Sequence, residues 1–434
     1  LTHRNYGDEV RLEIAHNCPT EMVDFLRKQC GMDQDNVYLV NGPVNVSRLQ
    51  AIYSLVERSN LKFKPFTQGR PSGTSSSSDL FATIKKQDVL LHHPYQSFSP
   101  VVDLIKQAAA DSSVLAIKQT LYRTGSKSPV VDALVAAAHA GKEVTVVIEL
   151  RARFDEAENV ALAARLQQAA VHVVYGIVGY KTHAKMLLIL RRENNKLRHY
   201  IHLGTGNYHR STSRIYTDYG LLTSDKQIGE DVSNLFVQLT SLGKIPKMHK
   251  LLHAPFTLHD GLLKRIEREI DNASAGKPAH IIVKCNSLVE PEMIQAFYRA
   301  SMAGVKVDLI IRGMCCLKPG VKGLSENIQV RSIIGRFLEH TRVFYFENNG
   351  ESEVWAASAD MMKRNLLRRV ETAFPILNSK LHQRVIDDLN LYLSDNTQAW
   401  ILSENGRYER VSRPDDQEAI SAQSNLLAQM EKAY

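Results

Sequence analysis

The chain has 434 residues, 44% of them hydrophobic, with unremarkable glycine and proline content, which indicates an ordinary globular protein of two or three domains. No apolar run approaches the roughly 18 residues of a membrane span and no signal-peptide pattern opens the chain. The cysteines are five, an odd number, which argues against a disulfide framework, and none has zinc-site spacing. The net charge of +8 favours an anionic partner. We expect a cytoplasmic protein, with membrane association as an alternative.

The first 69 residues are predicted to be the remainder of a domain whose start is missing, since the chain opens on Leu1. Alternating polarity predicts a strand over 10–15, and helices are predicted over 21–30 and 47–57. The Ser-rich stretch 71–78 predicts a flexible linker or loop.

From residue 70 to about 250 the pattern is that of an α/β domain. The predicted elements are a helix over 99–110, a strand over 114–121, a helix over 128–141, a strand over 144–150 and a helix over 155–169. This alternation predicts a mostly parallel sheet. The same order recurs from 251 to 434, after a helix over 262–270, and a last helix is predicted over 415–434.

One stretch places a histidine and a lysine at the mouth of a predicted strand. The sequence KTHAK at 181–185 leads into an apolar run, and residues two apart on a strand share one face, so His183 and Lys185 should point the same way. An imidazole can attack phosphorus while an ammonium holds a phosphate oxygen. The small residues in HLGTGNY, at 202–208, would let backbone approach an anion. The alternative for His183 is a histidine that merely packs at a strand end.

This pattern occurs twice. His340 and Arg342 precede an apolar strand and a small-residue turn that ends in Asp360. The upstream segments also correspond, 114–118 with 280–284 and 140–148 with 303–311. The sequence therefore predicts an internal duplication that brings His183 and His340 to one cleft.

Arginines follow three predicted strands at the edge where ligands of parallel sheets gather: Arg123, Arg153 and Arg312. Together they would suit a phosphate-rich ligand, whereas each one alone could equally be a solvated strand end. A further basic cluster, Lys363 to Arg369, lies near Glu371. No GxxxxGK[ST] loop occurs, so a nucleotide would be held in another way.

These stretches together resemble the polyphosphate kinase family, which makes inorganic polyphosphate from ATP. The matching segments are 88–95, 146–155, 181–188, 204–208, 213–219, 309–315 and 365–371. The resemblance implies an α/β protein with two related phospholipase D-like domains in tandem, at 70–250 and 251–434, after the remainder of an α+β head domain at 1–69. It also implies ATP, ADP and polyphosphate as partners, no nucleic acid, Mg²⁺ as cofactor, and a homo-oligomer that is a dimer or a tetramer.

The resemblance also assigns roles. His183 would carry the phosphoryl group, and His340 would act as acid/base or charge partner, with Lys185 and Glu371 beside them in the catalytic set. The residues implied at the nucleotide and its phosphates are Tyr216, Arg312, His340, Asp218 and Arg369. Arg123 and Arg153 match positions associated with magnesium. Because arginine has no lone pair for a cation, we expect these two to bind the phosphates that Mg²⁺ bridges.

Two other functions compete. The halves are similar to the phospholipase D superfamily, whose signature is H-x-K-x₄-D, so a phosphodiesterase or nuclease is the main alternative. Leu190 stands in place of the signature aspartate in the first half, and Arg342 and Glu347 depart from it in the second. The third hypothesis is a non-catalytic binder of polyanions, for which the net charge would suffice.

Overall fold

The computed structural model describes residues 9–124, 128–149, 156–177, 179–241 and 247–431, which belong to two compact units, Leu1–Phe66 and Thr67–Tyr434. In the first unit, β1 (Leu12–Ala15) and β2 (Val37–Val40) pair in parallel, and α2 (Thr20–Gln29) connects them. The predicted helix over 47–57 is confirmed only in part, because a 3₁₀ segment (Val46–Ala51) leads into a single α-helical turn, α3 (Ile52–Leu55). Neither piece buries a residue that could stabilise a longer, regular α-helix.

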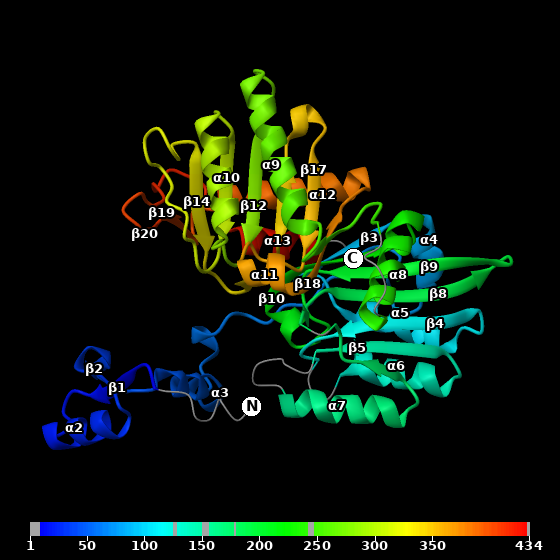
Figure 1. The fold of residues 1–434 in the computed structure, drawn as a ribbon, viewed down its shortest axis with the longest axis horizontal. Helices are drawn as coiled ribbons and strands as arrows, with labels where there is room; N and C mark the ends of the chain where they lie inside the picture. Colours follow the sequence, from blue (N-terminus) through cyan, green and yellow to red (C-terminus); the bar gives the residue numbers. More distant parts are fainter. Residues whose placement is uncertain (1–8, 125–127, 150–155, 178, 242–246, 432–434) are drawn as a thin grey trace. The chain divides into compact units, whose positions relative to one another are not determined.

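Two sheets of the second unit have the same strand order, which confirms the predicted duplication and the two related α/β domains in tandem (Figure 1). The first sheet runs β10 (Tyr216–Thr223), β9 (Lys196–Gly204), β8 (Lys185–Glu193), β4 (Val114–Leu121), β5 (Glu143–Ile148) and β6 (His172–Val174). The second runs β18 (Arg369–Pro375), β17 (Glu353–Ala357), β16 (Val343–Phe346), β12 (His280–Cys285), β13 (Lys306–Ile311) and β14 (Ile328–Ile333). We call these sheets, with their helices, the first and second domains.

The edges of the sheets also correspond. An antiparallel strand is added at β10 by β3 (Val89–His93) and at β18 by β11 (Leu252–Ala254). The second sheet continues past β14 into β19 (Ala399–Leu402) and β20 (Tyr408–Arg410).

The sheets are mixed, so the predicted mostly parallel arrangement is wrong. Strands β4, β5 and β6 are parallel, but β8, β9, β10 and β3 pair antiparallel. Between β8 and β9 the chain reverses over Asn194 and Asn195, whose φ angles of 47° and 63° suit a tight hairpin turn. A crossover helix is therefore unnecessary there, and the alternation of helices and strands holds only for the first part of each domain.

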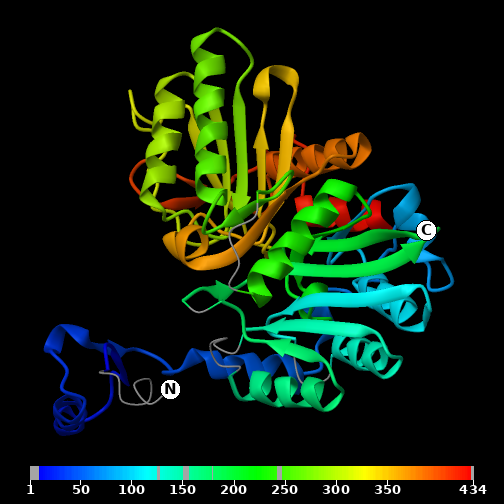
Figure 2. The same cartoon turned by 45° about the vertical axis from the view of Figure 1, so that its right-hand side comes forward.

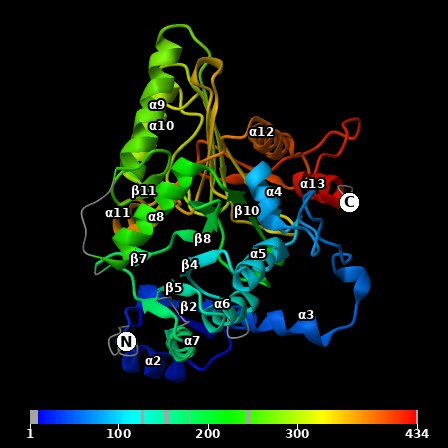
Figure 3. The ribbon, with the colours of Figure 1, turned by 90° about the vertical axis from the view of Figure 1, so that its right-hand side faces the viewer.

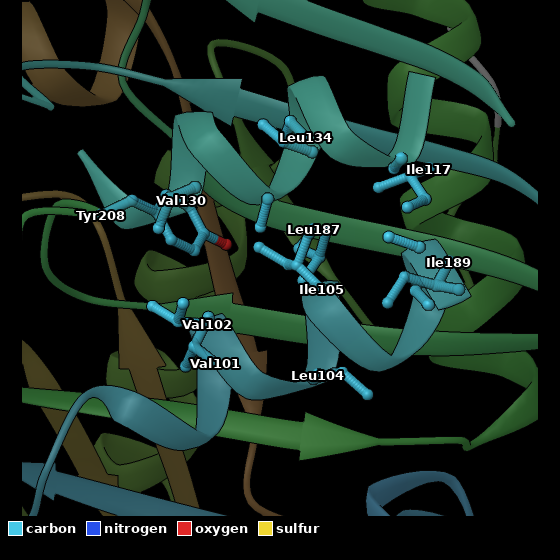
Figure 4. Close-up of a cluster of buried hydrophobic side chains, with 14 of the residues drawn as sticks. Val101, Val102, Leu104, Ile105, Ile117, Val130, Leu134, Leu187, Ile189 and Tyr208 are labelled. Carbon is cyan, nitrogen blue, oxygen red and sulfur yellow. The ribbon is translucent and has the colours of Figure 1, made fainter. Parts of the chain in front are cut away.

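Helices cover both faces of the first sheet. Figure 3 shows α8 (Lys226–Thr240) on one side of β4 and β8, with α5 (Ser99–Ala110) and α6 (Pro129–His139) on the other. Ile105, Ile117 and Leu187 are fully buried between α5, α6 and the sheet (Figure 4). The remaining helices are α4 (Leu80–Lys86) and α7 (Glu156–Gln168). The stretch 71–78 is a loop, as predicted, yet its Thr74 is buried and accepts from Arg70, so it is not a loose linker.

In the second domain α9 (Leu258–Ser274) and α10 (Pro291–Met302) lie on one face of the sheet and α12 (Ser379–Ser394) on the other (Figure 3). A short helix, α11 (Lys363–Arg368), precedes β18. Helix α9 is longer than predicted, whereas the last helix, α13 (Ala422–Glu431), begins later, because a turn follows Pro414. Figure 2 shows α13, in red, beside the first domain, where the carbonyl of Met430 packs against Gly69. No helix of the described residues is long and apolar enough to cross a membrane.

Candidate active site

Two short strands cross between the domains and carry the two histidines. From the first domain, β7 (Lys181–Thr182) pairs in parallel with β18, and from the second, β15 (Leu338–Glu339) pairs in parallel with β10. His183 directly follows β7, and His340 directly follows β15. Because the register continues, each histidine comes level with the third residue of the strand in the other domain, which is Glu371 for His183 and Asp218 for His340.

His183 is held by a carboxylate from the second domain. Its Nδ1 lies 2.8 Å from Oε2 of Glu371, a fully buried side chain that also accepts hydrogen bonds from Ser358 and Asn365. An ionised carboxylate can only accept, so Nδ1 carries the proton and Nε2 keeps its lone pair. No described residue hydrogen-bonds Nε2. The arrangement is that of an oriented neutral imidazole whose second nitrogen can react.

Burial sets the charge state of this histidine. Burial, and then the positive charge of Lys185, lower the pKa of His183 to about 3 against the opposing effect of Glu371. Burial also lowers the pKa of Lys185 to about 7. Burial alone would raise the pKa of Glu371, but His183 and Lys185 hold it below its usual value. The imidazole is therefore neutral at physiological pH while its partner is ionised.

Lys185 does not lie beside His183 on one strand, and that part of the sequence interpretation is wrong. Strand β7 ends at Thr182 and β8 begins at Lys185, because the amides of His183 and Ala184 both donate to the carbonyl of Val370, each at 2.9 Å. The ammonium of Lys185 is buried and donates to the backbone carbonyl of His183. It thus fixes the backbone that carries the imidazole and brings a positive charge next to it.

His340 is held by an equivalent carboxylate, from the first domain, but it has a different second neighbour. Its Nδ1 lies 2.9 Å from both carboxylate oxygens of Asp218. Nη1 of Arg342 lies 3.0 Å from Nε2 and 3.2 Å from Nδ1 of this ring, and Nε and Nη2 of the same guanidinium make a two-pronged ion pair with Asp360 at 3.1 and 3.0 Å. Burial and Arg342 lower the pKa of His340. Because a guanidinium faces its second nitrogen, His340 is less open to reaction than His183.

The glycine-rich stretch after β9 has a definite steric role. A Cβ atom on Gly206 would lie 2.1 Å from a carboxylate oxygen of Asp218, so no larger residue fits without moving that side chain. Thr205 donates its hydroxyl to the same carboxylate at 2.6 Å. The small residues that we expected to admit an anion therefore make room for the carboxylate that orients His340.

Several predicted nucleotide residues surround His340. The ring of Tyr216 lies 5.2 Å from that of His340. Arg312 donates through Nε and Nη2 to Asn286 Oδ1 at 3.0 and 2.7 Å, and through Nε to the carbonyl of Glu339. Arg312 is half-buried, so its guanidinium is both held and accessible.

The remaining predicted residues lie on the His183 side or outside the described residues. Arg369 Nη1 is 3.9 Å from Glu371. Arg123 follows β4 and is exposed, with its guanidinium carbon 5.5 Å from the ring of Tyr122, which itself lies 5.0 Å from the His183 ring. Arg153 lies outside the described residues. Apart from Arg153, the structure thus places each predicted residue at, or within one side chain of, one of the two histidines.

Sequence reasoning gave no role to five polar residues that hold the site together, which are Tyr122, Asn286, Ser358, Asp360 and Asn365. The duplication relates the two carboxylates that hold the histidines, because Asp218 and Glu371 occupy equivalent positions of β10 and β18, but it does not indicate these five residues. No three His, Cys, Asp or Glu side chains of the described residues are grouped to hold a metal ion.

Comparisons with known proteins agree along almost the whole chain. The sequence model of the polyphosphate kinase middle domain matches residues 1–52, that of C-terminal domain 1 matches 79–245, and that of C-terminal domain 2 matches 251–423. The polyphosphate kinase of Pseudomonas aeruginosa is 55% identical over 430 residues, which cover 99% of this chain and 62% of that protein. The polyphosphate kinase of Pseudomonas putida is 56% identical over 430 residues, covering 99% of this chain and 59% of that protein.

Among solved structures, the crystal structure of polyphosphate kinase from Porphyromonas gingivalis superposes with a TM-score of 0.89 at 33% identity. The match covers 98% of this chain and 65% of that one. The chain thus spans about 60% of the length of the curated relatives it matches.

Proposed function

The chain belongs to the polyphosphate kinase family, and on that premise we propose that it carries the site that reversibly transfers the γ-phosphoryl group of ATP, through a phosphohistidine on His183, to inorganic polyphosphate. The observation that supports this most directly is the state of His183. Its Nδ1 is bonded to Glu371 and burial keeps it neutral, so the lone pair on Nε2 is available for attack.

The proposed reaction has two displacements. In the first, Nε2 of His183 bonds to the γ-phosphorus, the bond from that phosphorus to its bridging oxygen breaks, and ADP leaves with the electron pair. The imidazole becomes positively charged, and Glu371 offsets this charge through Nδ1–H. In the second, a terminal oxygen of polyphosphate attacks the same phosphorus, the nitrogen–phosphorus bond breaks, and the chain is one phosphate longer.

Cationic side chains are proposed to offset the charge of the transferring group. A loose phosphoryl-transfer transition state spreads negative charge over its oxygens, which fixed donors stabilise. Lys185 and Arg369 lie near His183, and Arg342 lies at His340. Arg312 and Tyr216, with His340 and Asp218, are proposed to hold the nucleotide and its phosphates on the other side.

Magnesium is proposed to enter with the nucleotide. Because the described residues include no grouped set of protein ligands, the phosphates of ATP would supply most of the oxygens that Mg²⁺ prefers. When bound, the ion would withdraw charge from those phosphates. Arg123, which lies beside Tyr122 near His183, and Arg153 are proposed to bind the phosphate oxygens that the ion leaves uncovered.

We also propose the larger context of the site. Residues 1–69, 70–250 and 251–434 are proposed as the functional divisions of the chain, and the complete protein as a cytoplasmic homo-oligomer, a dimer or a tetramer. Light scattering of the full-length protein measures its mass, and cell fractionation distinguishes the cytoplasm from a membrane association.

Labelled ATP tests the proposed activity in the full-length protein. The proposal predicts γ-phosphate label on the protein and long polyphosphate as product. Hydrolysis of a phosphodiester without polymer formation would instead support the phosphodiesterase alternative. Binding of polyanions with neither label nor polymer would support a non-catalytic binder.

A further inference from the structure

A basic cavity of about 370 Å³ lies in the first domain, outside the candidate active site. Its cationic lining consists of Arg70, Lys106, Arg210 and Arg214. The beginnings of α5 and α6 contribute to the same cavity through Ser99 and Pro129. Both helices start at the edge of the sheet where β4 ends, so the cavity lies at that edge. Tyr122, whose ring is close to that of His183, follows β4 at the same edge.

The charge in this cavity is not balanced by the protein. The single carboxylate that lines it, Asp103, is 3.3 Å from Arg70, which also donates to Thr74. Lys106, Arg210 and Arg214 are exposed and form no ion pair among the described residues. Four cations against one carboxylate leave a net charge of +3 in a concave space, which favours an anion with several charges.

The wall of the cavity leads directly to the candidate active site. The 3₁₀ turn Thr212–Arg214 is fixed by a hydrogen bond of 2.9 Å from the buried Ser213 hydroxyl to the carbonyl of Arg210. Two residues after Arg214 comes Tyr216, whose ring is 5.2 Å from His340. A narrow second pocket shares Ser213 with the cavity and reaches Asp218, the carboxylate that holds His340. One loop therefore separates the basic cavity from the transfer site.

The lining favours phosphates over nucleotides. The aromatic side chain in the lining, Phe98, is only 5% exposed and packs against His93 and Tyr208, so it offers no open face for a base. Proteins that bind single-stranded nucleic acids combine a basic groove with exposed aromatic platforms. Here the described lining supplies the charge without the platform.

We propose that this cavity binds a segment of the inorganic polyphosphate chain away from its reacting end, and so retains the polymer between successive additions. The proposal rests on the polyphosphate kinase function proposed above and adds a second subsite to it. Arg210 and Arg214 would bind the phosphates, while Arg70, already fixed by Asp103 and Thr74, would complete the positive wall.

The test replaces two cavity cations in the full-length protein. The double variant Arg210→Ser with Arg214→Ser removes two charges, and the matched control, Arg192→Ser with Lys196→Ser, removes two exposed charges at the far end of the β8–β9 hairpin. Binding of long polyphosphate is measured by calorimetry over a range of salt concentrations. We expect the cavity variant to bind about tenfold more weakly, with a salt slope shallower by about 1 to 2, whereas the control matches wild type.

Enzyme assays provide a second readout. In the cavity variant the fold increase in the KM for polyphosphate should exceed the fold change in the rate of phosphoenzyme formation by at least about tenfold. The polymer that the variant makes before a chase should also be shorter. Equal polyphosphate affinity in the cavity variant and the control would overturn the proposal, as would equal displacement by single-stranded DNA. Failure of wild type to form a phosphoenzyme would instead contradict the proposed function, since calorimetry tests the cavity without turnover.

Discussion

Nδ1 of His183 and Oε2 of Glu371 lie 2.8 Å apart although the two residues are 188 positions apart in the sequence. The reverse contact joins His340 of the second domain to Asp218 of the first. Each domain therefore supplies one histidine and the carboxylate that orients the other histidine. Neither domain contains a complete pair, so the duplicated fold can form this site only when both domains are docked.

Replacing Glu371 by Gln tests the orienting contact. The amide keeps the size of the side chain but removes the charge that fixes the proton on Nδ1, so a fraction of His183 presents the wrong nitrogen. We expect phosphoenzyme formation in the full-length protein to fall on the order of 10²- to 10⁴-fold, as for other carboxylates that orient a reactive histidine. The matched control is Glu353→Gln in β17, whose carboxylate pairs with Arg265 instead. Equal rates in the two variants would contradict the orienting role.

The pH dependence of phosphoenzyme formation should show Lys185. Burial lowers its pKa to about 7, so its ammonium loses a proton as the pH rises through that value. The rate should therefore fall above about pH 7. Lys185→Arg keeps a positive charge at all these pH values and should remove the fall. An alkaline limb that is the same in both proteins would show that another group titrates.

Acid should destabilise the fold through buried histidines. Burial lowers the pKa of His202 from 6.5 to about 3. Burial is also the largest of several causes that lower the pKa of His183 from 6.5 to about 3. Between these values the unfolded chain binds a proton that the folded chain does not, so this stability is present above about pH 6.5 and is lost as the pH falls. The loss is about 1.4 kcal/mol per pH unit for each histidine. In His202→Gln, denaturant unfolding between pH 6.5 and 5 should show a slope shallower by about that amount, and an unchanged slope would refute the assignment.

The ion pair of Arg342 and Asp360 should be costly to break on one side only. Both side chains are buried, so Asp360→Leu leaves an uncompensated guanidinium and should lower the free energy of unfolding by about 3–5 kcal/mol. Adding Arg342→Leu should restore part of that loss, which a double-mutant cycle measures. The exposed pair of Asp132 and Arg165 is the control, where Asp132→Ala should cost under about 1 kcal/mol. If the losses in the free energy of unfolding at Arg342 and Asp360 were additive, the two charges would not stabilise each other.

Local sequence signals predicted some elements to the residue. The predicted helix over 99–110 and the predicted strand over 114–121 are both confirmed. The Ser-Pro pair marks the start of the helix, and the apolar pattern marks the strand. The duplication was also visible, since equivalent segments occur in the same order. It led to both histidines, and the structure places both at the interface between the domains.

Tertiary contacts decided what the sequence could not. The mixed sheet depends on the hairpin at Asn194 and Asn195, which lies outside the alternation of helices and strands. The break before Lys185 depends on the carbonyl of Val370, which belongs to the other domain. The pairing of His183 with Glu371 depends in the same way on β7 of the first domain pairing with β18 of the second, and no local sequence pattern indicates such a pairing.

The most direct test of this account is the position of the phosphoryl group on the labelled wild-type, full-length protein. After reaction with γ-labelled ATP, peptide mapping identifies the residue, and nuclear magnetic resonance of the phosphopeptide identifies the nitrogen. Because Nδ1 of His183 is occupied by Glu371, we expect an acid-labile, base-stable phosphoryl group on Nε2 of His183. Label on Nδ1, on a peptide without His183, or in an acid-stable linkage would contradict it.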